Sequence, residues 1–201
     1  MKRIISICLV IMLVFSAILT LNGCAKKVEI NEENIKAAVE TVETALKEFD
    51  TKTLEKYVDS PTLNFILPYA KQKAQFTELG QAMFESLEIE IKSIDAANKT
   101  VTIAAKNKDL YMEASNFAYD LKNSYSSMQL LSLVKDDDFL NSNLAPLVEK
   151  IKQAQMKEEP IEATLTVTNG SKGNLVLTFD ENAEDAVSGG ALSAIKKVFE
   201  V

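Results

Sequence analysis

The side chain with the clearest chemical potential is the thiol of Cys24, which directly follows Leu21, Asn22 and Gly23. A thiolate is a nucleophile that can be alkylated, and a small residue such as Gly23 lets a protease approach the backbone beside it. A second cysteine, Cys8, lies inside the apolar stretch that precedes this site. The chemistry that a thiol at this position offers is alkylation of its sulfur.

The residues before Cys24 have the pattern of an export signal. Lys2 and Arg3 form a positively charged start, and the segment from Ile4 to Leu21 is almost wholly apolar. This segment is nearly long enough to span a bilayer, which takes about 20 residues, so an uncleaved signal anchor and a buried core helix are the alternatives. The small residue before the cysteine favours cleavage. Cys8 would then leave with the leader, and the mature chain would contain no thiol pair.

The segment Leu21-Asn22-Gly23-Cys24 resembles the lipobox of bacterial lipoproteins. The resemblance implies that residues 1–23 are a lipoprotein signal peptide and that the Cys24 thiol receives diacylglycerol. It also implies that the mature protein is anchored by this lipid to the outer face of the bacterial cytoplasmic membrane. Residues 24–32 would be a short tether that reaches at most roughly 30 Å, so we expect the folded body to lie near the membrane.

The composition of the 201-residue chain excludes several kinds of chemistry. The chain has no histidine, and Arg3 is its only arginine. Without histidine it lacks the usual general base near neutral pH and the commonest metal ligand, which rules out Ser-His-Asp and Cys-His catalysis. Without Lys2 and Arg3 the balance is 20 basic against 29 acidic residues, a net charge of −9. An acidic chain disfavours nucleic acid and anionic lipid headgroups, so we expect no nucleic-acid partner. We also expect no metal and no cofactor.

The apolar pattern predicts a single α+β domain over residues 33–201. Helical spacing predicts helices over about 32–49, 50–59, 62–87, 109–128, 146–159 and 187–199. Strict alternation predicts hairpins over about 87–105 and 163–179. Pro68 is expected to break the third helix, and residues 135–143 are expected to form a loop. We therefore expect N-terminal helices packed on an antiparallel sheet of two hairpins, with a long helical insert between them and a C-terminal helix.

Two polar motifs could be mistaken for functional sites. Asp136, Asp137 and Asp138 suggest calcium, but the residues that follow lack the oxygen ligand and the glycine of a helix–loop–helix site. A solvated loop that caps a helix is the favoured interpretation. Ser188 precedes two glycines, but the chain offers no histidine to activate it and no phosphate-loop lysine follows. We therefore expect no calcium site at the three aspartates and no catalysis at Ser188.

Five residues are candidates for a ligand pocket: Tyr111, Phe117, Tyr119, Gly189 and Gly190. The three aromatic side chains either line a pocket or belong to the core, and the second interpretation is favoured. Gly189 and Gly190 fall inside a predicted helix, where each costs about 1 kcal/mol relative to alanine. One interpretation is that the two glycines let this helix approach the sheet closely or kink locally. The other is that they open space for a ligand.

Several segments resemble small exported lipoproteins of Gram-positive bacteria. The segments are LEKYVDSP, LEIEIKSIDAANKTVTIAAKNKDL, the helical excursion after it, EATLTVTNGSKGNLVLTFD and AVSGGALSAIKKV. Those proteins carry a domain similar to nuclear transport factor 2-like, cystatin-type cones, and most have no assigned function. The resemblance implies a cone-like sheet, whose concave face often binds small apolar molecules in that superfamily.

Three classes of function remain open. We expect first a non-catalytic, membrane-tethered binding or interaction module, with an envelope protein or a small apolar ligand as its partner. The alternative is a small-molecule-binding protein, or an acid/base enzyme, that uses the concave pocket of the cone. The third class is a structural accessory subunit of an envelope complex. A deep apolar pocket with one buried carboxylate would favour the second class.

Overall fold

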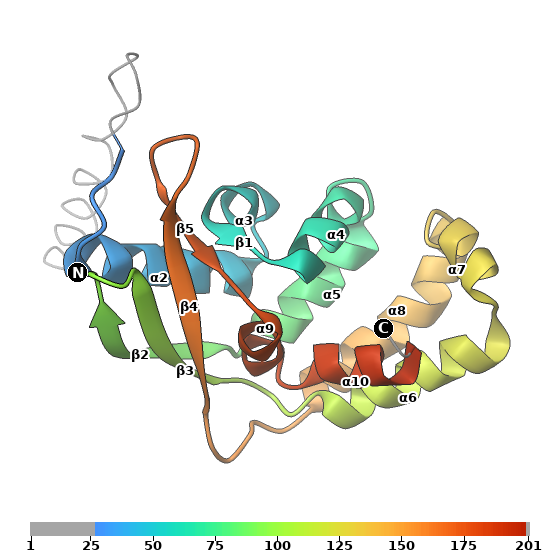
Figure 1. Ribbon diagram of the computed structural model, residues 1–201. Helices are drawn as coiled ribbons and strands as arrows, with labels where there is room; N and C mark the ends of the chain where they lie inside the picture. Colours follow the sequence, from blue (N-terminus) through green and yellow to red (C-terminus); the bar gives the residue numbers. More distant parts are fainter. Residues whose placement is uncertain (1–26, 200–201) are drawn as a thin grey trace, which may run out of the picture.

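The computed structural model describes residues 27–199, so the predicted signal peptide, the lipobox and Cys24 lie outside the described residues. Within this range nine helices accompany a five-stranded sheet, which confirms the predicted α+β class. Figure 1 shows the strands with helices α2 and α3 at one end of the molecule and a group of helices at the other. No helix in this part of the chain is long and apolar enough to cross a membrane.

The elements follow the chain in two runs of helices, each followed by a hairpin. The first run is α2 (Glu32–Glu48), α3 (Thr51–Tyr57), the short strand β1 (Val58–Asp59), α4 (Pro61–Ala70) and α5 (Ala74–Phe84). The first hairpin is β2 (Glu88–Asp95) and β3 (Thr100–Lys106). The second run is α6 (Tyr111–Ser124), α7 (Ser127–Leu133) and α8 (Asp137–Gln153). The second hairpin, β4 (Ile161–Asn169) and β5 (Leu175–Thr178), precedes α9 (Glu181–Val187) and α10 (Ala191–Phe199).

The sheet joins the two hairpins through its central pair of strands. Its order is β1-β5-β4-β3-β2, and β3 pairs with β4 in antiparallel register, with Ile103 opposite Ala163. At one edge β1 pairs in parallel with β5, with Val58 opposite Leu177. The alternation in the sequence indicated both hairpins, but a two-residue strand is too short to show any alternation. The sheet is therefore mixed rather than purely antiparallel.

Helix α2 packs its apolar face against the sheet. Ile35, Val39, Val42 and Leu46 recur at helical spacing and are all buried. Full burial of a side chain of this size stabilises a fold by about 1.5–3 kcal/mol. The helix begins where the sequence indicates, because the side chain of Asn31 accepts a hydrogen bond from the backbone N–H of Asn34 at 2.9 Å.

The helical insert differs from its prediction at two points. Most of the loop expected over 135–143 is helical instead, because residues 137–143 belong to the first half of α8, and Pro146 lies inside that helix. Asp136 caps it by accepting from the backbone N–H of Phe139 at 2.9 Å, and the acidic residues of the first turn favour the helix dipole. The helix predicted over 109–128 instead ends at Ser124, because Ser126 begins α7 with a capping box.

Pro68 does not break its helix. It lies inside α4, and the chain leaves helical structure only at residues 71–73. A proline one turn from the end of a helix removes a single backbone hydrogen bond, which the last turn tolerates more easily than the middle of a helix does.

The C-terminal helix is divided at residues 188–190 into α9 and α10. Gly189 and Gly190 have φ angles of 64° and 89°, in the region that favours glycine. A Cβ atom on Gly189 would overlap the backbone carbonyl oxygen of Lys108, and the backbone N–H of Leu110 donates to the carbonyl of Gly189 at 2.9 Å. The glycines thus allow a close approach of two backbones. We call this crossing of residues 107–110 over residues 187–190 the junction.

A buried asparagine completes the junction. The side chain of Asn107 is fully buried, and its Nδ2 donates to the carbonyl oxygens of Met83 and Val187 at 2.9 and 2.7 Å. These carbonyls lie in the last turns of α5 and α9, where no intrahelical donor is left for them. One side chain therefore ties the ends of two helices to the connection between β3 and α6.

We expect Gly189→Ala to lower the free energy of unfolding by about 2–4 kcal/mol, because alanine is strained at this φ and its Cβ would collide with a backbone atom. Gly190→Ala should cost less, since its Cβ would meet the Cβ of Tyr111 at 3.3 Å. Urea unfolding followed by circular dichroism measures both. Equal stability of Gly189→Ala and the unsubstituted chain would contradict the close approach.

Candidate functional site

A cavity of about 440 Å³ lies among the helices beside one end of the sheet. Ligand pockets typically measure ~300–1,000 Å³ and are mostly apolar. Its wall comes from α4, α5, α6, α8 and α10, with further residues from α2, α7 and α9 and from Phe179, which directly follows β5; no described strand contributes a lining residue. The cavity is therefore enclosed by helices and does not lie on a face of the sheet.

The cavity lies between two hydrophobic clusters. One cluster contains the sheet with α2, and it presents Leu46, Phe49 and Phe179 to the cavity. The other joins α5, α6, α8 and α10, and it presents Phe117 and Ile195 among its partly buried members. Met83 on α5 packs against both clusters, so α5 links them, and the junction fixes the ends of α5 and α9.

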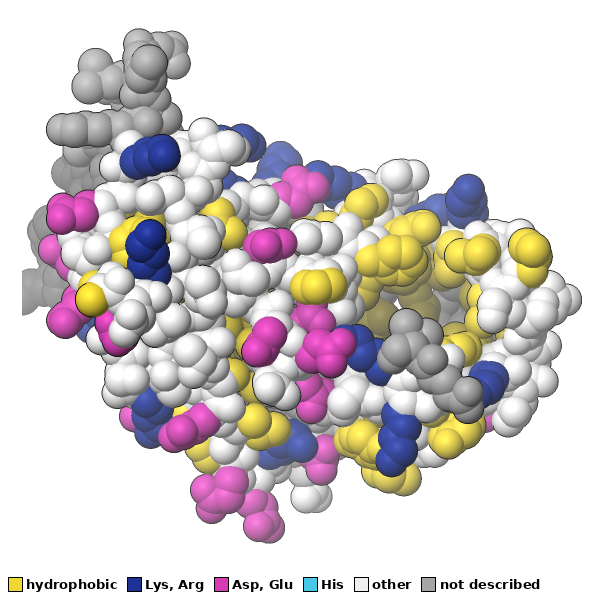
Figure 2. Space-filling model, viewed as in Figure 1, with side chains coloured by type: hydrophobic (Ala, Val, Ile, Leu, Met, Phe, Trp, Pro, Cys, Tyr) yellow, Lys and Arg dark blue, Asp and Glu magenta, His cyan; other side chains and the backbone are white. Residues whose placement is uncertain are grey.

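A second hollow of about 470 Å³ adjoins the cavity and opens to the surface. Residues of α4 and α7 line it together with Phe199, and Phe65, Ile66, Phe76, Leu130, Val134 and Phe199 also line the cavity. We call this outer hollow the mouth. Figure 2 shows a hollow on this face with apolar side chains gathered above it, over α4 and α7. Phe65 and Leu131, both in the wall of the mouth, are 64% and 61% exposed.

The mouth is bounded on one side by a weakly held helix. Helix α7 buries none of its residues, and Met128 on it is 77% exposed. A segment with few buried apolar contacts opens at low free-energy cost. Helix α7 is thus the part of the cavity wall that can move most easily.

One carboxylate lies in the wall of the cavity. Glu184 on α9 is only 2% exposed, and its carboxylate accepts hydrogen bonds from Ser60 Oγ, from the backbone N–H of Thr62 at 2.9 Å and from Thr62 Oγ1 at 2.8 Å. Lys196 Nζ lies 3.9 Å from it. A carboxylate at the N-terminus of α4 also favours the helix dipole. Glu184 thus ties α9 to the start of α4, and three donors occupy its oxygens.

The structure separates the five candidate pocket residues. Phe117 lines the cavity. Tyr111 packs in the cluster of α5, α6, α8 and α10 and would contact a Cβ atom on Gly190, while Gly189 lies at the junction. Tyr119 is half exposed. The glycines approach the connection between β3 and α6 rather than the sheet, and the space that they provide is filled by backbone.

The polar residues of the cavity were not found from the sequence. Ser60 shows a signal, because it stands before Pro61 as an N-cap and accepts from the backbone N–H of Leu63 at 3.1 Å. No sequence signal marks Glu184 as a cavity residue, because its partner Ser60 is 124 positions away in the chain. Among the described residues, no group of three or more histidine, cysteine or acidic side chains is placed to hold a metal ion.

Comparisons of the chain with family models, with curated proteins and with solved structures give no match. The case for a functional site therefore depends on the geometry of this chain.

We expect Glu184→Ala to lower the free energy of unfolding by about 2–4 kcal/mol, because it leaves the buried donors of Ser60 and Thr62 without an acceptor. Glu184→Gln keeps one acceptor oxygen and should cost less. Glu181→Ala is the matched control: Glu181 lies on the same helix and pairs with the same lysine at 2.9 Å, but its side chain is 83% exposed. If all three variants unfold at the same urea concentration, the carboxylate does not hold α9 to α4.

Proposed function

We propose that this protein is a non-catalytic binding module of the bacterial envelope that holds a small apolar molecule, or the apolar tail of an amphipathic one, in the cavity. The observation that carries the proposal is a helix-walled cavity of about 440 Å³ that opens through an apolar mouth. Transfer of an apolar ligand from water into such a site lowers the free energy and therefore favours binding.

The carboxylate supports binding rather than acid/base catalysis. A general base must be able to reach the proton that it removes. The oxygens of Glu184 are instead engaged by Ser60 and Thr62, in the wall of the cavity. Three donors around one carboxylate are typical of a structural polar group.

We also propose that the chain is a lipoprotein anchored through Cys24 and that its sheet is a divergent form of the nuclear transport factor 2-like cone. The lipobox pattern at residues 21–24 supports the first part. The second is supported by an N-terminal helix on a sheet of two hairpins that a helical insert separates. The ligand site would then lie among the helices beside the sheet, with walls from α4, α5, the insert and α10, instead of on the concave face of the sheet.

Leu121→Trp tests the binding site. Leu121 lines the cavity from α6, so a larger side chain there should fill the cavity and weaken binding of the apolar fluorophore N-phenyl-1-naphthylamine by at least about tenfold. Met112→Trp on the same helix is the control, since Met112 is 62% exposed and outside the cavity wall. Fluorescence titration gives both dissociation constants.

Two outcomes would count against the binding site. Equal affinity in both tryptophan variants would place the fluorophore elsewhere on the surface. Absence of binding to the unsubstituted chain would favour the interaction module with an envelope protein as its partner. Circular dichroism of each variant confirms that the helices are intact.

Cys24→Ala tests the anchor. We expect it to abolish incorporation of radioactive fatty acid and release the protein from its lipid attachment, because the acceptor sulfur is lost. Cys8→Ala is the matched control and should label normally, since Cys8 lies within the predicted signal peptide. Normal labelling of the Cys24→Ala chain would refute the lipoprotein proposal.

A further inference from the structure

Three turns of the chain lie along one edge of the molecule, the upper edge in Figure 1. They are the α4–α5 turn (71–73), the α7–α8 turn (134–136) and the β4–β5 turn (170–174). The first described residue, Lys27, lies at the same edge, because the backbone N–H of Val28 donates to the carbonyl of Gly173 at 2.9 Å. Asn169 Nδ2 also donates to the carbonyl of Val28 at 2.7 Å. The chain that leads to Cys24 therefore leaves the body at the upper edge.

The position of Cys24 limits where a lipid anchor can be. Lys27 is only three positions after Cys24, and three fully extended residues span about 11 Å. A lipid on Cys24 would hold the β4–β5 turn within about that distance of the bilayer surface. The upper edge is thus the part of the body closest to the membrane.

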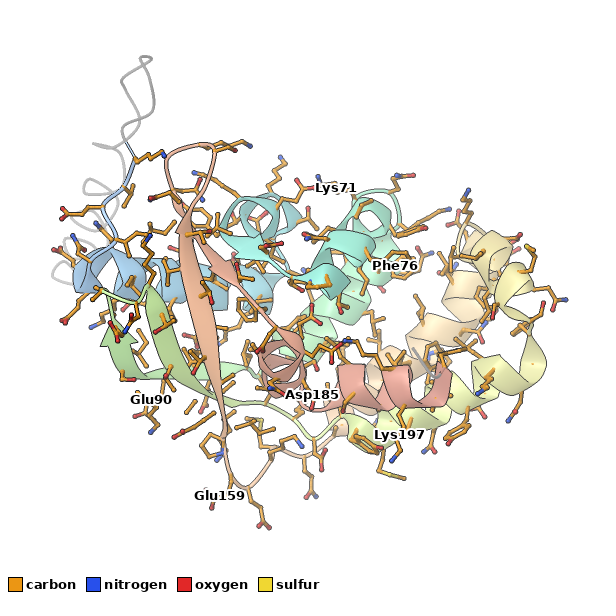
Figure 3. The ribbon with its side chains drawn as sticks, in the orientation of Figure 1. Lys71, Phe76, Glu90, Glu159, Asp185 and Lys197 are labelled. Carbon is orange, nitrogen blue, oxygen red and sulfur yellow. The ribbon has the colours of Figure 1, made fainter. Side chains whose placement is uncertain are left out.

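The upper edge is basic although the chain as a whole is acidic. The three turns contain Lys71, Lys73, Lys135 and Lys172 against a single acidic residue, Asp136. Lys71 and Lys73 pair with acidic side chains of neighbouring helices, whereas Lys135 and Lys172 are exposed. Figure 2 shows lysine side chains along this edge, with acidic groups more frequent toward the opposite side. Figure 3 places Lys71 at the upper edge and Glu90 and Glu159 on the lower side.

The mouth of the cavity borders the same edge. Phe65 lies on α4, which ends at the α4–α5 turn, and Leu131 lies on α7, which ends at the α7–α8 turn. Both side chains are mostly exposed, as is Met128. Exposed apolar side chains next to lysines are typical of surfaces that rest on anionic bilayers, where the apolar groups enter the interface and the ammonium groups meet lipid phosphates.

We propose that the upper edge lies on an anionic phospholipid bilayer and that a phospholipid acyl chain enters the cavity from it through the mouth. The inference rests on the proposed function, since it names the ligand class for the same cavity. The net negative charge of the chain does not oppose it, because screening at physiological ionic strength limits electrostatic effects to about 8 Å and the lysines are the charges nearest the lipid. Movement of α7 is the step that admits the chain.

The absence of tryptophan from the sequence makes a direct test available. A single tryptophan is introduced into the full chain at one of four positions, and the protein is reconstituted into phosphatidylglycerol vesicles whose acyl chains carry bromine, a contact quencher of tryptophan fluorescence. Leu131→Trp reports on the mouth and Phe117→Trp on the cavity wall. Lys197→Trp, on the lower side of α10 in Figure 3, and the exposed Met112→Trp on α6 are the controls.

We expect quenching in Leu131→Trp and Phe117→Trp to exceed that in the two controls by at least about twofold, because only these positions would contact lipid chains. Equal quenching at all four positions, or stronger quenching of Lys197→Trp, would overturn the orientation. Quenching of Leu131→Trp without quenching of Phe117→Trp would overturn entry of the acyl chain. If the protein fails this quenching test but still binds N-phenyl-1-naphthylamine, the proposed function stands and only the lipid inference fails. If it shows neither quenching nor binding of the fluorophore, both proposals are refuted.

The charge requirement has its own matched pair of variants. Lys135→Glu combined with Lys172→Glu should lower quenching of Leu131→Trp by about half, because both changes put like charge against the lipid phosphates. For the control, Lys92→Glu is combined with Lys197→Glu, which gives the same charge change away from the upper edge; Lys92 pairs with Glu90, on the lower side, at 2.9 Å, and Lys197 lies on the lower side of α10. The control should retain more quenching than the first pair. Equal effects of the two pairs, or no effect in either, would overturn the charge complementarity on which the orientation depends.

Discussion

At the junction two backbones lie in direct contact, and this contact sets the distance between the two hydrophobic clusters. Side chains elsewhere can repack around a small change, but a carbonyl oxygen against a glycine Cα leaves nothing to repack. The buried side chain of Asn107 holds the same two backbone segments together, because its amide donates to carbonyls at the ends of α5 and α9. Closing the cavity would require these buried groups to give up their partners, which costs more than a typical exposed hydrogen bond.

The cavity and the carboxylate follow from that constraint. With the clusters held apart, the apolar walls lack partner atoms on one side and forgo part of their dispersion energy. A ligand that fills the space restores those contacts and stabilises the folded chain by an amount that rises with the logarithm of its concentration above the dissociation constant. Glu184 holds the start of α4, and with it the side of the mouth that carries Phe65, against α9. The opposite side, α7, has no such tie among the described contacts, so the two sides of the mouth differ in stiffness.

The sequence indicates local features well and distant ones poorly. The hairpins are visible because one face of each strand is buried, as Ile103 and Leu165 show, and Asn31 marks the start of α2 through its own hydrogen bond. Residues 137–143, in the segment 135–143, were wrongly expected to be a loop because aspartates are poor helix formers in general but good ones in a first turn. Phe117 was found as an aromatic on an apolar helix face. The cavity itself was not predictable, since eight helices supply most of its wall and only tertiary packing decides their spacing.

The pairing of the sheet also governs the order in which the molecule can fold. Strand β3 meets β4 only after the whole helical insert has been made, and β1 waits for β5, more than a hundred residues further along the chain. Closing such long loops costs entropy before any contact repays it, so the sheet forms late while α6, α7 and α8 can form from local contacts. A chain interrupted before Leu175 would therefore keep β4 with an open edge and β1 without a partner. Unpaired strand edges of this kind are templates for aggregation, so the segment from Leu175 onward protects the rest of the chain from self-association.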